Sequence, residues 1–203
     1  MISPELKFAL EQLKYPLHFI DFETYSGAIP HHKGMRPYEK VAFQWSCHTI
    51  NNPGADPVHS EFLNEEYDFP NFRFAKSLMV QIGESGTPFM WSTFENTILK
   101  DVLHQMESLN YEDEILKNWL INITTDKDAI PARKGRFVDL NDLTNKYYFH
   151  PDMKGKKNNK KVLPAIWNNN PYLHDNPWFS QYVTGDALSS KSLYDSLAPI
   201  INE

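Results

Sequence analysis

The sequence predicts an α/β layer fold built on a mixed β-sheet, because three early strands are followed by alternating helices and strands. The apolar run "LHFIDFETYSG" is typical of a buried strand that ends in two acids. The segment "VAFQWSCHTI" alternates apolar and polar side chains, and "VHSEFL" follows it after the turn "NNPGADP" as an antiparallel partner. The segment "NFRFAKSLMVQIG" has apolar residues at helical intervals and ends at a glycine.

The remaining elements follow in chain order. Ser3, Pro4 and Glu5 form a helix-start signature, and we expect a helix from there to about Lys14 that ends at Pro16. Residues 25–40 are expected to form a loop. The pattern then predicts a buried strand at "TPFMW" and a helix at "STFENTILKDVLHQM". Further helices are expected near "YEDEILKNWLI", "FVDLNDLTNKYY" and "GDALSSKSLYDSL".

Length and composition indicate one domain over residues 1–203, with residues 1–16 as a helix that precedes the core. The chain has 203 residues, of which 41% are hydrophobic, enough for a sizeable core. A single cysteine excludes an internal disulfide, and the N-terminus does not resemble a signal peptide. No apolar run approaches the roughly 20 residues that span a bilayer. We therefore expect a soluble cytoplasmic protein without a membrane partner.

A net charge of −6 argues against a protein that coats nucleic acid by bulk electrostatics, but it leaves room for an enzyme that acts on nucleic acid. Asp21 and Glu23 are two residues apart, so on a strand they point to the same face. They stand at the carboxyl end of that strand, where α/β proteins tend to bind ligands. A hard divalent cation such as Mg²⁺ or Mn²⁺ would relieve their repulsion. The alternative is a strand whose last side chains simply reach solvent.

Three motifs resemble those of the DnaQ-like, or DEDD, 3′–5′ exonucleases. "FIDFET" is similar to the first motif, with Asp21 and Glu23 as its acids. "FMWSTFENTILKDVL" is similar to the second, although Glu95 stands where the family usually has Asp, and Ser92 where it has Asn. "QYVTGDALSSKSLYDSL" is similar to the third, with Asp186 as its acid.

The third motif also matches the branch of the superfamily that has a tyrosine before the acid, since Tyr182 lies four residues before Asp186. "RFVDLNDL" resembles a further element in which Asp139 supports the site without binding metal. The ordered motifs are also similar to an uncharacterised bacterial domain family within this superfamily. The resemblance implies a ribonuclease-H-like three-layer fold with helices on both faces of the mixed sheet. It leaves open that the chain is part of a longer protein.

The resemblance implies a catalytic role for five residues and a two-metal site. Asp21, Glu23, Glu95 and Asp186 would hold two Mg²⁺ or Mn²⁺ ions, and Tyr182 would orient the attacking water or help it lose a proton. Alternatively, Tyr182 packs beside other aromatic residues, and Glu95 is an acid favoured by the helix dipole. The expected activity is 3′–5′ exonucleolytic hydrolysis, with single-stranded nucleic-acid ends as substrate.

A basic segment, "KGKKNNKKVL", precedes the third motif. We interpret it as a mobile loop that contacts substrate phosphate, whereas the alternative is a solvated loop without function. Its expected substrate-binding residues are Lys154, Lys156, Lys157, Lys160 and Lys161.

Two other functions remain open. One is a nuclease-like domain that binds nucleic acid or a protein partner without cleaving, which the departures at Ser92 and Glu95 favour. The other is a ribonuclease-H-type endonuclease, which shares the same acids. The sequence does not decide between DNA and RNA, and it leaves the oligomeric state unknown.

Overall fold

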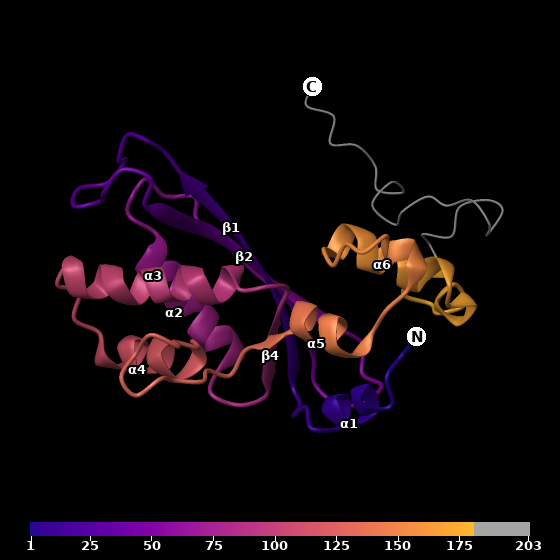
Figure 1. The fold of residues 1–203 in the computed structure, drawn as a ribbon. Helices are drawn as coiled ribbons and strands as arrows, with labels where there is room; N and C mark the ends of the chain where they lie inside the picture. The colour runs from indigo at the N-terminus through magenta and orange to yellow at the C-terminus, as the bar shows by residue number, and fades with distance from the viewer. Residues whose placement is uncertain (181–203) are drawn as a thin grey trace. The chain divides into compact units, whose positions relative to one another are not determined.

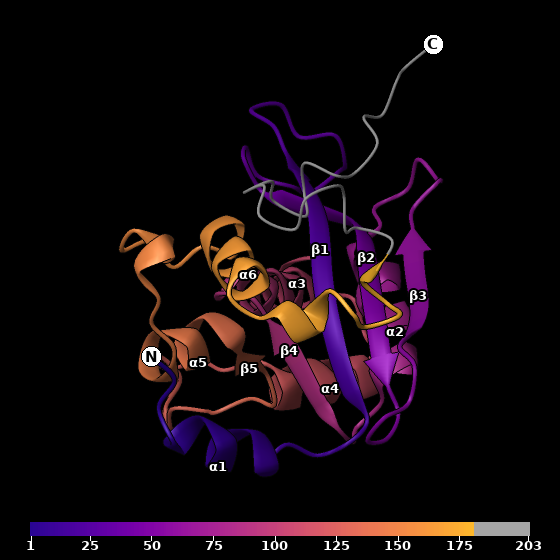
Figure 2. The same ribbon diagram turned by 90° about the vertical axis from the view of Figure 1, so that its right-hand side faces the viewer.

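The computed structural model describes residues 1–180 and contains one five-stranded sheet (Figure 1). Figure 2 looks onto this sheet, in which the strands follow the order β3-β2-β1-β4-β5. β2 is antiparallel to β1 and to β3, whereas β1 is parallel to β4 and β4 is parallel to β5. The strands are β1 (Leu17–Ser26), β2 (Lys40–Ile50), β3 (Val58–Leu63), β4 (Thr87–Met90) and β5 (Val138–Asp139).

Six α-helices accompany the sheet in the described part of the chain. They are α1 (Glu5–Glu11), α2 (Asn71–Ile82), α3 (Phe94–Ser108), α4 (Glu114–Ile123), α5 (Leu140–Tyr147) and α6 (Asn159–Asn168). The α/β class and the mixed sheet that the sequence predicts are confirmed, and the architecture is consistent with a three-layer α/β fold. The helix expected at "GDALSSKSLYDSL" lies outside the described residues.

The chain divides into two compact units. One is Phe8–Leu140 and contains the whole sheet, and the other combines Met1–Lys7 with the described residues that follow Leu140. In the second unit, the backbone N–H of Ser3 donates to Tyr147, and that of Phe149 donates to Met1. These bonds tie the first residues of the chain to the end of α5.

The core of the sheet unit lies between one face of the sheet and the helices α2, α3 and α4, which Figure 1 shows together against that face. Phe22 of β1 meets Phe74 of α2 edge to face, with ring centroids 4.8 Å apart. The helices add the fully buried side chains of Leu78, Ile98, Leu99, Val102, Leu116 and Leu120. Gly83 ends α2 with a positive φ of 54°, as the sequence pattern predicts.

A chain of buried amides joins this core to the start of β2. Asn71, which is 1% exposed, accepts a hydrogen bond from the Ala42 backbone N–H and donates to the Lys40 carbonyl. Asn71 also donates to the Gln105 side chain, and Gln105 donates in turn to Glu39. The network therefore fixes the segment that enters β2 against α2 and α3.

Two elements differ from the sequence prediction. The segment expected to be helical from Phe137 begins instead with the two-residue strand β5, because Val138 and Asp139 pair with β4, and the helix starts only at Leu140. The basic loop expected over residues 154–163 is helical from Asn159, so Lys160 and Lys161 belong to α6. Val162 and Ala165 are three residues apart and buried, and this apolar stripe stabilises the helix despite its charged start.

The first helix is shorter than expected, because α1 ends at Glu11. Throughout residues 1–180, no helix combines the length and the apolar character needed to cross a membrane.

Replacing Asn71 with Ala should destabilise the sheet unit. The change leaves the Ala42 N–H without its buried acceptor, removes one of two amide donors to the Lys40 carbonyl and breaks the bond to Gln105. Together these losses cost about 2–4 kcal/mol of unfolding free energy. Urea denaturation measures this loss. Asn118→Ala, at an exposed position of α4, is the control and should change stability by less than about 0.5 kcal/mol. Equal stability of the two variants would contradict a structural role for the amide network.

Candidate functional site

Three parallel strands end at one edge of the sheet and place acidic residues there. β1 pairs with β4 through Phe19 and Phe89, and β4 pairs with β5 through Met90 and Asp139. The carboxyl ends of parallel strands meet at the same edge, so Asp21, the turn after β4 and Asp139 lie at that edge.

Asp21 and Glu23 share the face of β1 that is turned away from the core. Both are exposed, and they alternate with the buried Ile20 and Phe22. Their neighbours on β2 are Ser46 and Gln44, and the pairing becomes irregular directly after Glu23. The two carboxylates are therefore accessible to a ligand from solvent.

The turn after β4 is held by Asp139. Ser92 has a left-handed backbone with a φ of 73°, and its N–H donates to Asp139 Oδ1 at 2.9 Å. Thr93 then occupies the N-cap position of α3, and Glu95 falls in the first turn of that helix. Asp139 thus fixes the turn that places Glu95, and its supporting role in a catalytic site stays a prediction.

Glu95 is a buried acid whose charge is disfavoured. It is 3% exposed, and burial is the main reason why its pKa rises from 4.5 to about 7. Its own backbone N–H partly offsets this effect, whereas the negative charges of Asp21 and Asp139 raise the pKa further. Asp21 and Asp139 therefore lie close enough to Glu95 to act on it electrostatically.

Glu95 Oε2 is buried and has no hydrogen-bond partner within residues 1–180, and the same holds for the indole nitrogen of Trp91. A buried acceptor without a donor is costly, and either a proton or a cation would satisfy it. An oxygen-only donor set suits Mg²⁺ or Mn²⁺. As the side chains stand, however, the described residues include no group of three His, Cys, Asp or Glu residues that could hold a metal ion.

Two of the predicted site residues, Tyr182 and Asp186, lie outside the described residues, so their positions stay predictions. The five lysines of the basic segment are all exposed and belong to the second unit, whereas Asp21, Glu23, Glu95 and Asp139 belong to the first. Cys47 is fully buried and burial raises the pKa of its thiol, which disfavours the reactive thiolate.

Fold and site together define an α/β protein with an acidic cluster at the carboxyl edge of its parallel strands. The members of this cluster are Asp21, Glu23, Glu95 and Asp139. A family model described as a domain of unknown function, DUF2779, matches residues 18–158, and the chain belongs to this family. The match contains Asp21, Glu23, Glu95 and Asp139 and confirms the expected membership of an uncharacterised domain family. No curated protein and no solved structure matches the chain.

The raised pKa of Glu95 predicts a pH-dependent stability. The folded protein keeps the Glu95 proton to higher pH than the unfolded chain does, so the free energy of unfolding falls as the pH rises from about 4.5 to about 7. Between pH 5 and pH 8 the loss amounts to about 2–3 kcal/mol. Glu95→Gln should remove this part of the pH dependence, as measured by urea denaturation at both pH values.

Glu107→Gln provides the matched control, because Glu107 is exposed on the same helix. It should keep the wild-type pH dependence. If Glu95→Gln also kept it, Glu95 would not carry a raised pKa in the folded protein.

Proposed function

We propose that this chain is a metal-dependent phosphodiester hydrolase of the DnaQ-like superfamily that removes nucleotides from the 3′ ends of single-stranded nucleic acid. The observation that carries the proposal is the acidic cluster at the carboxyl edge of β1, β4 and β5, with a buried Glu95 oxygen that has no donor within residues 1–180. The order of the sequence motifs supports the same activity.

Each residue of the cluster has a distinct task in this proposal. Asp21 and Glu23 offer solvent-facing carboxylates, and Glu95 offers a buried one. Asp139 does not ligate but holds the Ser92 turn in place. Together with Asp186, the first three acids would bind Mg²⁺ or Mn²⁺, which when bound activates water and stabilises charge on the phosphate.

Glu95 must lose its proton to act as a ligand. Because its pKa is about 7 in the absence of metal, ligation near neutral pH releases a proton from a fraction of the molecules. Tyr182, as the sequence resemblance implies, would orient the attacking water. The lysines of the basic segment would contact substrate phosphate, with Lys160 and Lys161 presented by α6.

Purified protein with Mn²⁺ should shorten a 5′-labelled single-stranded oligonucleotide stepwise, giving a ladder on a denaturing gel. Asp21→Asn should lower the rate by at least about 100-fold, because it removes charge where the metal would bind. Asp128→Asn, at an exposed loop position, is the control and should leave the rate unchanged. Wild-type activity in the Asp21 variant would contradict the assignment.

A second candidate is a nuclease-like domain that binds nucleic acid or a protein without cleaving. It is favoured by the lack of a ready group of three metal-binding side chains within residues 1–180, and by the burial of Glu95. Calorimetric titration with Mn²⁺ at pH 8 separates the candidates. An absence of binding heat, together with retention of intact oligonucleotide, would favour the non-cleaving domain. Internal nicks in a circular substrate would instead indicate an endonuclease.

A further inference from the structure

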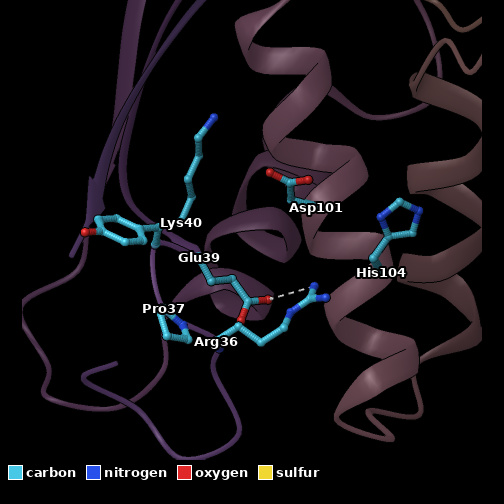
Figure 3. A pocket seen from close by; sticks show the side chains of 7 residues that line it. Arg36, Pro37, Glu39, Lys40, Asp101 and His104 are labelled. Carbon is cyan, nitrogen blue, oxygen red and sulfur yellow. Dashed lines mark hydrogen bonds and ion pairs between the residues drawn. The ribbon is translucent and has the colours of Figure 1, made fainter. Parts of the chain in front are cut away.

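A pocket of about 380 Å³ lies between the segment that enters β2 and the helix α3 (Figure 3). Its volume falls in the range of small-ligand pockets, roughly 300–1,000 Å³. Its lining residues carry both signs of charge, and they are Arg36, Pro37, Tyr38, Glu39, Lys40, Asp101 and His104. Asp101 is six residues beyond Glu95 on α3, about 9 Å along the helix axis, so the pocket is separate from the acidic cluster.

The wall formed by the β2-entry segment is fixed by hydrogen bonds. Glu39 accepts from the Arg36 backbone N–H at 2.8 Å and from the buried Gln105 side chain at 3.1 Å. Tyr38, which has a positive φ of 62°, donates its N–H to the Gly27 carbonyl, and its own carbonyl accepts from the Ser26 hydroxyl. The pocket is therefore formed before any ligand arrives, which lowers the entropic cost of binding.

Three polar side chains of the pocket have no hydrogen-bond or ion-pair partner in the described part of the chain. They are Lys40, Asp101 and His104, and Figure 3 shows all three along the pocket. The Lys40 ammonium lies over the Phe94 ring, 5.1 Å from its centroid. Burial raises the pKa of Asp101, although the charges of Lys40 and His104 act in the opposite direction. Lys40 and Asp101 are half-buried and His104 is exposed, so all three side chains can contact a ligand that enters the pocket.

The chemistry of the lining restricts the ligand. Arg36, Lys40 and His104 suit an anionic group such as phosphate. A carboxylate such as that of Asp101 suits a hydroxyl donor, as in the acidic residues that bind the ribose of dinucleotides. Tyr38 is exposed and can stack on a planar base. A small free amino acid such as glycine also carries both charges, but it would leave most of the volume empty and would offer no ring to Tyr38.

We propose that this pocket binds a nucleoside monophosphate, with its phosphate on Arg36, Lys40 and His104 and a ribose hydroxyl on Asp101. The proposal goes beyond hydrolysis at the acidic cluster and does not depend on it. The bound nucleotide occupies a separate site on the side of α3 that carries Asp101 and His104.

Calorimetric titration of the full chain with AMP in the presence of EDTA tests this proposal. EDTA removes divalent cations, so any metal-dependent binding at the acidic cluster does not contribute. AMP should bind saturably at one site, and adenosine and inorganic phosphate should each bind at least about tenfold more weakly, because each lacks one half of the recognised group. A free amino acid such as glycine should give no saturable binding.

Variants assign the binding to the pocket. Asp101→Ala and Lys40→Met should each weaken AMP binding by about tenfold or more. The matched controls Glu107→Ala, on the same helix, and Lys33→Met, in the preceding loop, should bind as the wild type does. Arg36→Met is a third test that spares the fold, since this side chain is 81% exposed. Circular dichroism checks the folding of every variant.

Asp21→Asn distinguishes the two sites, because it should abolish hydrolysis while leaving AMP binding intact. The pocket proposal is overturned if AMP shows no saturable binding, or if folded Asp101→Ala, Lys40→Met and Arg36→Met proteins all keep wild-type affinity. Tighter binding of glycine than of AMP would overturn it as well. None of these outcomes bears on oligonucleotide cleavage, which is measured separately.

Discussion

The parallel pairing of β1 with β4, and of β4 with β5, is the constraint on which the acidic cluster depends. These pairings bring Asp21, the Ser92 turn and Asp139 to one edge, although they are far apart in the chain. A slip of one residue in either pairing would move the acids to the opposite face of the sheet. Because β5 has only two residues, the Ser92–Asp139 hydrogen bond helps to hold β5 in its register with β4.

Charge at the cluster is coupled to the fold through Glu95. The helix start favours a negative side chain, but burial and the neighbouring carboxylates oppose it. The backbone N–H at the start of α3 is not enough to offset the burial of Glu95 and the charges of Asp21 and Asp139. A proton or a cation resolves it, so the same position links stability, pH and ligand binding. Such a conflict is common where a fold is arranged for binding rather than for stability alone.

Much of the fold follows from periodicity in the sequence. Alternation identifies β1 and β2 and puts Asp21 and Glu23 on one face, and helical spacing identifies α2 and α3. β5 was missed because two residues show no period. The start of α6 was predicted as a loop because its lysines and asparagines precede an apolar stripe too short to show a clear helical period. The pocket beside α3 was not predicted either, since its lining side chains come from distant segments and meet only after folding.

The backbone of Ser92 bears on one departure from the exonuclease motifs, namely serine at a position where those motifs usually have asparagine. Its backbone is left-handed, a conformation that costs most residues energy but that asparagine adopts more readily. An asparagine at position 92 would therefore meet a geometric demand of this peptide chain, apart from any contact that its amide made. Serine adopts this left-handed conformation at a higher cost in backbone energy than asparagine would. The residue at position 92 therefore sets how much backbone strain the turn before α3 carries.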